Sequence, residues 1–468
     1  MHRKATGTYP LDRELPTSDH KVAVKKYKIK PLAHALHLED APVNSSALAA
    51  QWPTVNVRVS SNRVERRWDH KIFRTLADGD VVQGIPVYNR YDNTNYALIL
   101  TETDLAKVMT GTSETYQYLT QTYVGGHITN ITGDTVTGDA NAKFLDDSKA
   151  EDGDKFILNE NHEAAKEPSG TVAKPNPWIT LHTDVSHVIT NTSIFTEGTY
   201  AGTTGDLLGD PKHYKIRKVY SVPSGERWQY ATVAGKFCFT NGNVYGQYWS
   251  GTDTDYATDI NTASIYQARY CVAYANRLWT ADMYDAGLGT RNPWILRGSK
   301  INDPTNYTDS TAADYYFYDM PDPITGLGVV GDQLIVYRKT MYHFGRRTST
   351  STDPLYFPGY QTGVGLHAPY SLVHYLGTNA WLGVDNFYTM NGTTAVAIGG
   401  PIRKKFFSII DDDDLEKVFG INNYRYSEIL WVAQTTEGQK CFSWNYAENS
   451  WSVYEFDGNL SGLGGFGL

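Results

Sequence analysis

The chain has few cysteines and no long apolar segment. Its 468 residues include three Cys and no apolar run approaching the roughly 18 residues of a membrane-spanning helix. The start, Met1-His2-Arg3-Lys4, has no apolar stretch behind it, so we expect neither a signal peptide nor a membrane-spanning segment. Cys238, Cys271 and Cys441 are widely spaced and lie within or beside apolar runs. They are predicted to be buried free thiols, because disulfide frameworks and metal sites need clustered cysteines.

Signatures of common enzymes are also missing. The segment His162-Glu163-Ala164-Ala165-Lys166 begins like a zinc-protease helix but has Lys where the second histidine ligand belongs. There is no Gly-x-Ser-x-Gly elbow for a nucleophilic serine, no complete phosphate-binding loop around Gly235-Lys236, and no Ser-x-Asp-x-Gly-x-x-Trp turn of the sialidase type. The sequence therefore predicts a protein that is not an enzyme and uses no cofactor or metal.

The charge of the chain disfavours a protein that coats nucleic acid. The net charge is −9, which opposes extensive phosphate contacts but suits a surface past which DNA slides without binding. Asp253, Asp255 and Asp259 have some of the spacing of a cation loop, but the Gly and terminal Glu of an EF-hand are absent. We interpret them as part of a solvated loop.

What the sequence has in abundance are residues of half-buried strands and tight turns. It contains 34 Tyr, 11 Trp and 41 Gly, with 41% apolar residues. Tyr and Trp favour pleated surfaces, and Gly favours the turns that join short strands. The composition predicts an all-β protein with a sizeable core.

Six short apolar runs recur along the chain. They are Tyr96–Thr101, Lys236–Thr240, Arg277–Thr280, Gln333–Tyr337, Ala380–Gly383 and Glu428–Val432. The last five start 41, 56, 47 and 48 residues apart, close to the roughly 40–50 residues of propeller repeats. The first gap is 140 residues, or one repeat and roughly 95 residues more. The spacing predicts a six-bladed β-propeller with a domain inserted in one blade.

The same pattern divides the chain into five segments. We expect an extended N-terminal arm at 1–50, the first part of the propeller at 51–124, an inserted small β-barrel-like domain at 125–219, the remainder of the propeller at 220–458, and a Gly-rich tail at 459–468.

Two charged groups are candidate functional residues. The arm is rich in lysine, and docking of an extended arm on another chain competes with a solvated terminus as its interpretation. Its candidate subunit or adaptor contacts are Lys21, Lys25, Lys26, Lys28 and Lys30. The second group, Asp411, Asp412, Asp413 and Asp414, suits the start of a helix, where the dipole favours carboxylates. The alternative places these four residues on a channel wall that repels DNA.

Several turns between the runs resemble those of a known family. Arg297-Gly-Ser-Lys-Ile-Asn-Asp-Pro-Thr-Asn-Tyr307, Gly383-Val-Asp-Asn-Phe-Tyr388 with Gly400-Pro-Ile-Arg403, and Trp444-Asn-Tyr446 through Ser450-Trp451-Ser452 are similar to blades of the β-propeller tail proteins of short-tailed bacteriophages. These include the tail nozzle (tail tubular protein B) and the packaged-DNA stabilisation or tail hub proteins. Within the insertion, Asp134–Gly138, Gly153-Asp154 and Tyr214–Ile216 resemble a small β-barrel module of phage virion proteins.

The resemblance implies a structural virion protein without catalytic residues. Such proteins are expected to form a homo-oligomeric, hexameric ring below the portal–adaptor ring and to enclose the channel through which DNA leaves. They retain packaged DNA and carry tail fibres or a needle. The resemblance thus implies a location in the virion tail, after assembly in the host cytoplasm.

Two other functions remain open from the residues alone. A carbohydrate-binding or carbohydrate-active propeller would use exposed Tyr and Trp to stack on sugars, although the sialidase turns and an obvious carboxylate pair are absent. A kelch-like interaction scaffold has its only local hint in Trp444–Trp451.

Overall fold

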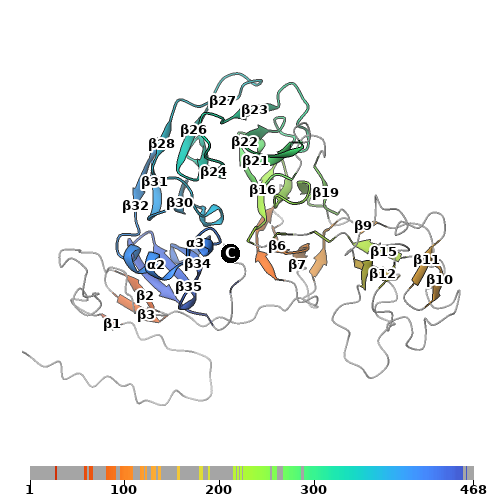
Figure 1. Ribbon diagram of the computed structural model, residues 1–468, viewed down its shortest axis with the longest axis horizontal. Helices are drawn as coiled ribbons and strands as arrows, with labels where there is room; N and C mark the ends of the chain where they lie inside the picture. Colours follow the sequence, from red (N-terminus) through yellow and green to blue (C-terminus); the bar gives the residue numbers. More distant parts are fainter. Residues whose placement is uncertain are drawn as a thin grey trace, which may run out of the picture.

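The computed structural model describes most of the propeller and the strands of the other segments. The described residues are 27–28, 57–60, 63–66, 81–90, 95–108, 116–120, the strands between 122 and 217, 219–220, 222–223, 225–252, 256–260, 267–285, 289–456 and 460. Six antiparallel sheets are arranged around a common axis, so the prediction of a six-bladed β-propeller is confirmed (Figure 1). Among the described residues, no helix is long and apolar enough to cross a membrane.

Each blade is formed by consecutive strands. Blade 1 contains β4 (Val82–Gly84), β5 (Val87–Asn89), β6 (Asn95–Thr101), β7 (Leu105–Val108) and β8 (Tyr116–Tyr118). Blade 2 contains β16 (Gln229–Val233), β17 (Lys236–Thr240), β18 (Gln247–Trp249) and β19 (Thr258–Asp259). Blade 3 contains β20 (Tyr270–Tyr274), β21 (Arg277–Asp285), β22 (Thr290–Gly298) and β23 (Ala313–Tyr316). Blade 4 contains β24 (Ile324–Val330), β25 (Gln333–Arg338), β26 (Met341–Arg347), β27 (Leu355–Tyr356) and β28 (Tyr360–Thr362). Blade 5 contains β29 (Val373–Tyr375), β30 (Thr378–Leu382), β31 (Phe387–Asn391) and β32 (Thr394–Ala397). Blade 6 contains β33 (Phe419–Asn423), β34 (Glu428–Thr435), β35 (Gly438–Asn445) and β36 (Ser450–Tyr454). The described helices are η4 (Pro369–Ser371), α2 (Arg403–Ile409), α3 (Asp412–Leu415) and η5 (Tyr424–Tyr426).

The six apolar runs of the sequence form one equivalent strand per blade. They lie in β6, β17, β21, β25, β30 and β34, the strand that pairs with the axial strand of each blade. Both faces of this strand meet neighbouring blades, which explains why its sequence is a continuous apolar run rather than an alternating one. In blades 2, 3 and 5 a two-residue turn precedes it, Ala234-Gly235, Ala275-Asn276 and Leu376-Gly377, and both residues have positive φ. This is the turn whose twist matches antiparallel strands.

Large aromatic side chains fill the space between blades. Trp279, Trp381 and Trp431 occupy the runs of blades 3, 5 and 6 and are fully buried. Their indole N–H groups donate to the backbone oxygens of Tyr274, Gly365 and Ser371 at 3.1, 3.1 and 2.9 Å, respectively. Buried indoles need such an acceptor because an unpaired N–H is costly.

Two glycines make room for these indoles. A Cβ on Gly298 would lie 2.7 Å from Trp279, and a Cβ on Gly420 would lie 2.8 Å from Trp431. Side chains at these two positions would therefore displace the tryptophans from their packed positions.

Five of the six blade interfaces share an apolar cluster between neighbouring blades. Within the described residues, blades 6 and 1 share none. The cluster on the remaining face of blade 6 comprises Tyr370, Phe419, Val432, Cys441 and Tyr454. Cys238, Cys271 and Cys441 are buried free thiols, as predicted. Burial raises the pKa of the Cys271 thiol to about 12, so this cysteine is protonated.

Two further sheets lie outside the ring. Seven strands follow blade 1 and precede blade 2, in the order β10-β11-β14-β13-β12-β15-β9, and their sheet lies beside the propeller (Figure 1). They are β9 (Thr122–Tyr123), β10 (Ile128–Thr132), β11 (Thr135–Gly138), β12 (Lys155–Leu158), β13 (Ile179–His182), β14 (Val188–Ile189) and β15 (Tyr214–Arg217). A second sheet, β1-β3-β2, consists of β1 (Tyr27–Lys28), β2 (Val57–Ser60) and β3 (Arg63–Arg66), and β2 lies against β36 of blade 6.

Blade 4 contains a buried arginine and histidine side by side. The fully buried Arg338 pairs with Asp319 (Nη1 to Oδ1, 2.9 Å), and its Nη1 is 3.3 Å from Nε2 of His343. Burial, followed by the adjacent Arg338, lowers the pKa of His343 to about 4, although Asp319 and Asp322 act in the opposite direction. The folded protein therefore holds a neutral imidazole.

This lowered pKa predicts a pH-dependent stability. The unfolded chain, with a histidine pKa near 6.5, binds more protons than the folded protein between about pH 6.5 and 4. The stabilisation is complete above pH 6.5 and is lost as the pH falls toward 4. We expect His343 to account for a fall on the order of 2 kcal/mol in the free energy of unfolding between pH 7 and 5. Urea denaturation of wild type and His343→Gln at both pH values measures it, and equal falls in the two proteins would contradict the assignment.

Candidate functional site

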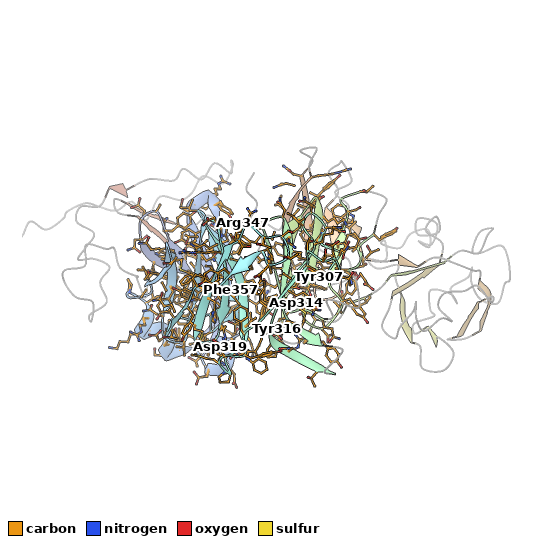
Figure 2. All side chains as sticks on the ribbon, turned by 90° about the horizontal axis from the view of Figure 1, so that it is seen from above. Tyr307, Asp314, Tyr316, Asp319, Arg347 and Phe357 are labelled. Atoms are coloured by element: carbon orange, nitrogen blue, oxygen red, sulfur yellow. The ribbon has the colours of Figure 1, made fainter. Side chains whose placement is uncertain are left out.

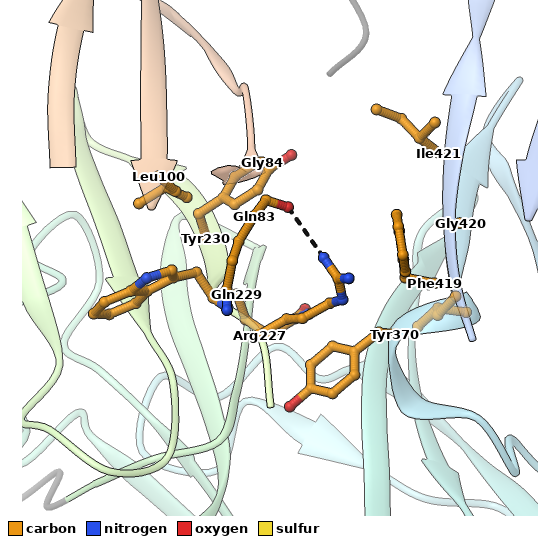
Figure 3. A pocket seen from close by; sticks show the side chains of 12 residues that line it. Gln83, Gly84, Leu100, Arg227, Gln229, Tyr230, Tyr370, Phe419, Gly420 and Ile421 are labelled. Atoms are coloured by element: carbon orange, nitrogen blue, oxygen red, sulfur yellow. Dashed lines mark hydrogen bonds between the residues drawn. The ribbon is translucent and has the colours of Figure 1, made fainter. Parts of the chain in front are cut away.

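A pocket of about 160 Å³ opens at the propeller axis. The axial strands β4, β16 and β33, together with η4 ahead of β29, bring side chains of blades 1, 2, 5 and 6 to one place (Figure 3). The lining residues are Gln83, Gly84, Leu100, Arg227, Trp228, Gln229, Tyr230, Tyr370, Leu372, Phe419, Gly420 and Ile421. Concave sites with apolar walls and a few polar groups are where proteins most often bind small ligands.

The segment before β16 carries Arg227 toward the axis. A turn closes where Glu226 N–H donates to the Pro223 oxygen at 2.9 Å, and Gly225 within this turn has a φ of +86°. Beyond the turn, Trp228 N–H donates to Gln83 Oε1 at 3.3 Å. Trp228 is anchored further because its indole N–H donates to Thr101 O at 2.7 Å. The segment thereby joins blade 2 to blade 1.

Arg227 itself reaches across to blade 6. Its guanidinium carbon lies 3.5 Å from the centroid of the Phe419 ring, and Nη1 donates to the Gln83 backbone oxygen at 3.3 Å (Figure 3). Burial lowers the pKa of Arg227 to about 10, opposed by Tyr370 and Glu102. The group is still a cation at neutral pH, stacked on an aromatic face as guanidinium groups favour.

Beside the pocket, opposite charges alternate in a network. Arg269 pairs with Glu226 (Nη2 to Oε1, 2.8 Å) and with the buried Asp282 (Nη1 to Oδ2, 2.9 Å). Asp282 also pairs with Arg291 at 3.2 Å, and the hydroxyl of Tyr370 donates to Glu226. The network joins residues of blade 3 to η4 of blade 5 through Glu226, which precedes blade 2.

The pKa shifts follow from this alternation. Burial lowers the pKa of Arg269, but the carboxylates of Asp282 and Glu226 outweigh it and the pKa is raised. Burial, together with nearby Tyr270 and Glu226, raises the pKa of Tyr370 well above its usual value, so its phenol is a neutral donor. Because Glu226 already accepts from two groups, the network holds the axis together and offers no free carboxylate as a base.

The candidate residues from the sequence lie elsewhere. Asp412–Asp414 form the first turn of α3 with Asp411 as its N-cap, as the helix-start interpretation predicts. Asp411, Asp412 and Asp413 are exposed, and Asp414 pairs with Lys417 at 2.9 Å. The alternative interpretation, in which these four carboxylates lie on a channel wall, stays a prediction. Lys28 falls in β1, whereas Lys21, Lys25, Lys26 and Lys30 lie outside the described residues, as do Asp253 and Asp255. In the described part of the chain, no cluster of His, Cys, Asp and Glu is arranged to hold a metal.

The sequence did not reveal the axial residues. Glu226, Arg269 and Tyr370 come from three separate interblade segments, and none belongs to a motif. The only local signal is Arg227-Trp228 at the point where strand-like patterning resumes.

Comparisons with known proteins give weak likenesses alone. No family model and no curated protein matches the sequence. Among solved structures, "YCF48 bound to D1 peptide" is similar at 8% identity and a TM-score of 0.32, over 49% of this chain and 69% of that chain. YCF48 from Cyanidioschyzon merolae matches at 8% identity and a TM-score of 0.29, over 77% and 94%. The computationally designed Ika8 protein matches at 9% identity and a TM-score of 0.27, over 77% of this chain and 96% of that chain. With TM-scores below 0.5, these likenesses carry no argument.

Removing the central charge of the axial network tests its role. Asp282→Asn leaves two buried or half-buried arginines without their shared carboxylate and is expected to cost about 3–5 kcal/mol of unfolding free energy. The control is Asp314→Asn, which breaks the more exposed Arg297–Asp314 pair (2.8 Å) and is expected to cost less than about 1 kcal/mol. Urea denaturation measures both. If Asp282→Asn cost no more than its control, the network would not stabilise the axis.

Proposed function

We propose that this protein is a structural component of a short-tailed phage virion. In this proposal it forms a nozzle or hub ring around the DNA-ejection channel, retains packaged DNA and carries fibres or a needle. The β-propeller fold is the part of this function established by the structure. The observation that favours the finer assignment is the order of the family-like turns, which fall in blades 3, 5 and 6 in the sequence expected from the resemblance.

These turns have specific structures that explain their residues. In the turn after blade 3's third strand, Asp303 accepts from the N–H and hydroxyl of Thr305 at 3.2 and 2.7 Å. Tyr307 closes this turn by burying its ring, with its hydroxyl donating to Leu278 O at 3.3 Å. In blade 5, Asp385 accepts from the hydroxyl of Tyr388 at 2.6 Å and from Arg403. Each motif thus fixes a loop at the surface of a blade, where contacts with other tail proteins would form.

The extra sheets suit assembly into a ring. Cyclic assembly by head-to-tail contacts needs two different patches on each subunit. The β1-β3-β2 sheet lies at blade 6, and the seven-stranded sheet lies beside the propeller between blades 1 and 2 in chain order (Figure 1). These two sheets supply the two patches, and DNA passes through the assembled ring without sequence-specific contacts. A ring subunit of this kind needs no catalytic group.

The test is assembly of the purified protein, alone and with a portal–adaptor ring. We expect light scattering to give six copies of the 52.3-kDa chain and negative-stain images to show a ring with a channel. The triple variant Lys21→Glu, Lys25→Glu, Lys26→Glu is expected to raise the protein concentration needed for assembly at least tenfold, because it reverses the charge of the arm. The matched control reverses Lys300, Lys339 and Lys404 on the propeller. A strict monomer under both conditions would overturn the proposal.

An exposed aromatic shelf favours one second candidate, a carbohydrate-binding propeller. Tyr316 and Tyr318 are 53% and 58% exposed, and their rings stack at 5.5 Å with 28° between planes. Asn292 Nδ2 donates to the Tyr318 hydroxyl at 2.8 Å and fixes that ring. Figure 2 labels Tyr316 among the side chains of the propeller, between Asp314 and Asp319. Flat, rigid aromatic faces of this kind suit stacking on a sugar ring.

A glycan array separates the second candidate from the first. If the shelf binds sugars, Tyr316→Ala with Tyr318→Ala is expected to lower binding at least tenfold, whereas Tyr424→Ala, an exposed tyrosine of η5, leaves it unchanged. Absence of any glycan bound by the wild-type protein would rule the shelf out as a sugar site.

A further inference from the structure

Arg227 is a half-buried cation without an acidic partner. Buried charges in proteins are normally paired, because desolvation of an isolated ion is costly. Among the described residues no carboxylate lies within ion-pair distance of its guanidinium. Within the described residues, its guanidinium donates one hydrogen bond, to the Gln83 backbone oxygen at 3.3 Å, which uses one of five N–H donors.

Neither the acidic residue adjacent in sequence nor the one that acts on Arg227 electrostatically is its ion-pair partner. Glu226 directs its carboxylate to Arg269 and Tyr370. Glu102 attracts the guanidinium electrostatically but forms no ion pair with it. Phe419 contacts the guanidinium over its ring face, with 3.5 Å between the guanidinium carbon and the ring centroid, and an aromatic ring offers no lone pair to the remaining N–H groups.

We propose that the axial pocket is a binding site for a carboxylate carried on a flat or branched apolar body, with Arg227 as the residue that holds the carboxylate. Such a group is present both in a free aromatic acid and in an apolar residue at the carboxyl end of a peptide. The inference concerns the single chain and does not depend on ring assembly or on the proposed virion role.

The remaining walls match the two halves of such a ligand. Leu100, Leu372 and Ile421 with the rings of Tyr230 and Phe419 supply apolar contact for the body. The amide of Gln83 accepts from Trp228 N–H at 3.3 Å and donates to the Glu226 backbone oxygen at 3.4 Å, so it fixes the segment that carries Arg227. Gln229 lies in the same wall and offers a further polar contact beside the carboxylate (Figure 3).

The size of the pocket limits the body to about one ring. Its volume of about 160 Å³ is close to the roughly 150 Å³ of a cavity known to accommodate benzene. Ligands of this size bind weakly even when well matched, so a Kd in about the millimolar range is expected for benzoate.

The chain offers a way to fill the pocket without touching Arg227. A Cβ built on Gly84 meets no atom within 4 Å, and Gly84 has no positive φ that would strain a side chain. Gly84→Val is therefore expected to fold and to occupy space at the pocket wall. Gly420, by contrast, has Trp431 against it and is unsuited to the same change.

The experiment measures ligand binding to the full-length protein by saturation-transfer NMR and calorimetry. The probes are benzoate for the free acid, N-acetyl-phenylalanine for the peptide end, and benzyl alcohol and N-acetyl-phenylalanine amide as their uncharged counterparts. We expect wild type to bind at least one acid at least tenfold more tightly than its uncharged counterpart. The acid that binds more tightly identifies the source of the carboxylate.

Three variants locate the site. Arg227→Gln is expected to weaken acid binding at least tenfold, Arg227→Lys to restore part of it, because lysine keeps the charge but lacks the planar fork, and Gly84→Val to weaken it through lost volume. Arg346→Gln, at an exposed arginine of blade 4, is the matched control and leaves binding unchanged. Circular dichroism verifies that each variant is folded.

The proposal is overturned if neither acid binds wild type at an acid concentration 20-fold above the expected millimolar Kd, or if the uncharged probes bind as tightly as the acids. It is also overturned if folded Arg227→Gln and Gly84→Val both bind the acids as wild type does.

Discussion

The structure depends on aromatic packing between blades. Each blade has two faces to bury, and a sheet with both faces apolar is stable only when neighbours cover both. Trp279, Trp381 and Trp431 fill this space from equivalent strands, and their indole N–H groups donate to backbone oxygens that precede them in the chain. The same contact recurs in blades 3, 5 and 6, where it fills the space between neighbouring sheets of the ring. The pocket and the charge network beside it both depend on this packing of the blades.

A network of charges lies beside the pocket, on β21, on β22 and on the segments that precede β16 and β20. Charges at this place must be paired, and the order Arg291, Asp282, Arg269, Glu226 does so by alternation, with the neutral phenol of Tyr370 at its end. Asp282 is the centre of the arrangement since it joins two arginines while almost wholly buried. The network is therefore structural, and Arg227 beside it differs because it stacks on Phe419 instead of joining a carboxylate.

The periodic part of this fold could be predicted from the sequence, and the site could not. The six apolar runs mark one buried strand per blade because that strand is apolar on both faces, a local property that the sequence carries directly. The buried thiols followed from the same runs. The pocket instead combines Gln83, Arg227 and Phe419, whose proximity exists only once the ring has closed. Asp411–Asp414 illustrates the opposite case: a conspicuous charge run that the structure places in the first turn of a short helix.

The position of the pocket connects ligand binding to the ring itself. Five interfaces between blades have shared apolar clusters, whereas the described residues of blades 6 and 1 meet around the pocket, where Arg227 reaches from blade 2 to Phe419 while bonded to Gln83 of blade 1. A ligand that contacts both walls binds only the closed arrangement, and by linkage it stabilises that arrangement in proportion to its saturation. At the first-to-last junction, the chain contributes β2, which precedes blade 1 and lies against β36 of blade 6. An anion at Arg227 would add a contact between the walls of the pocket that blades 1, 2 and 6 supply.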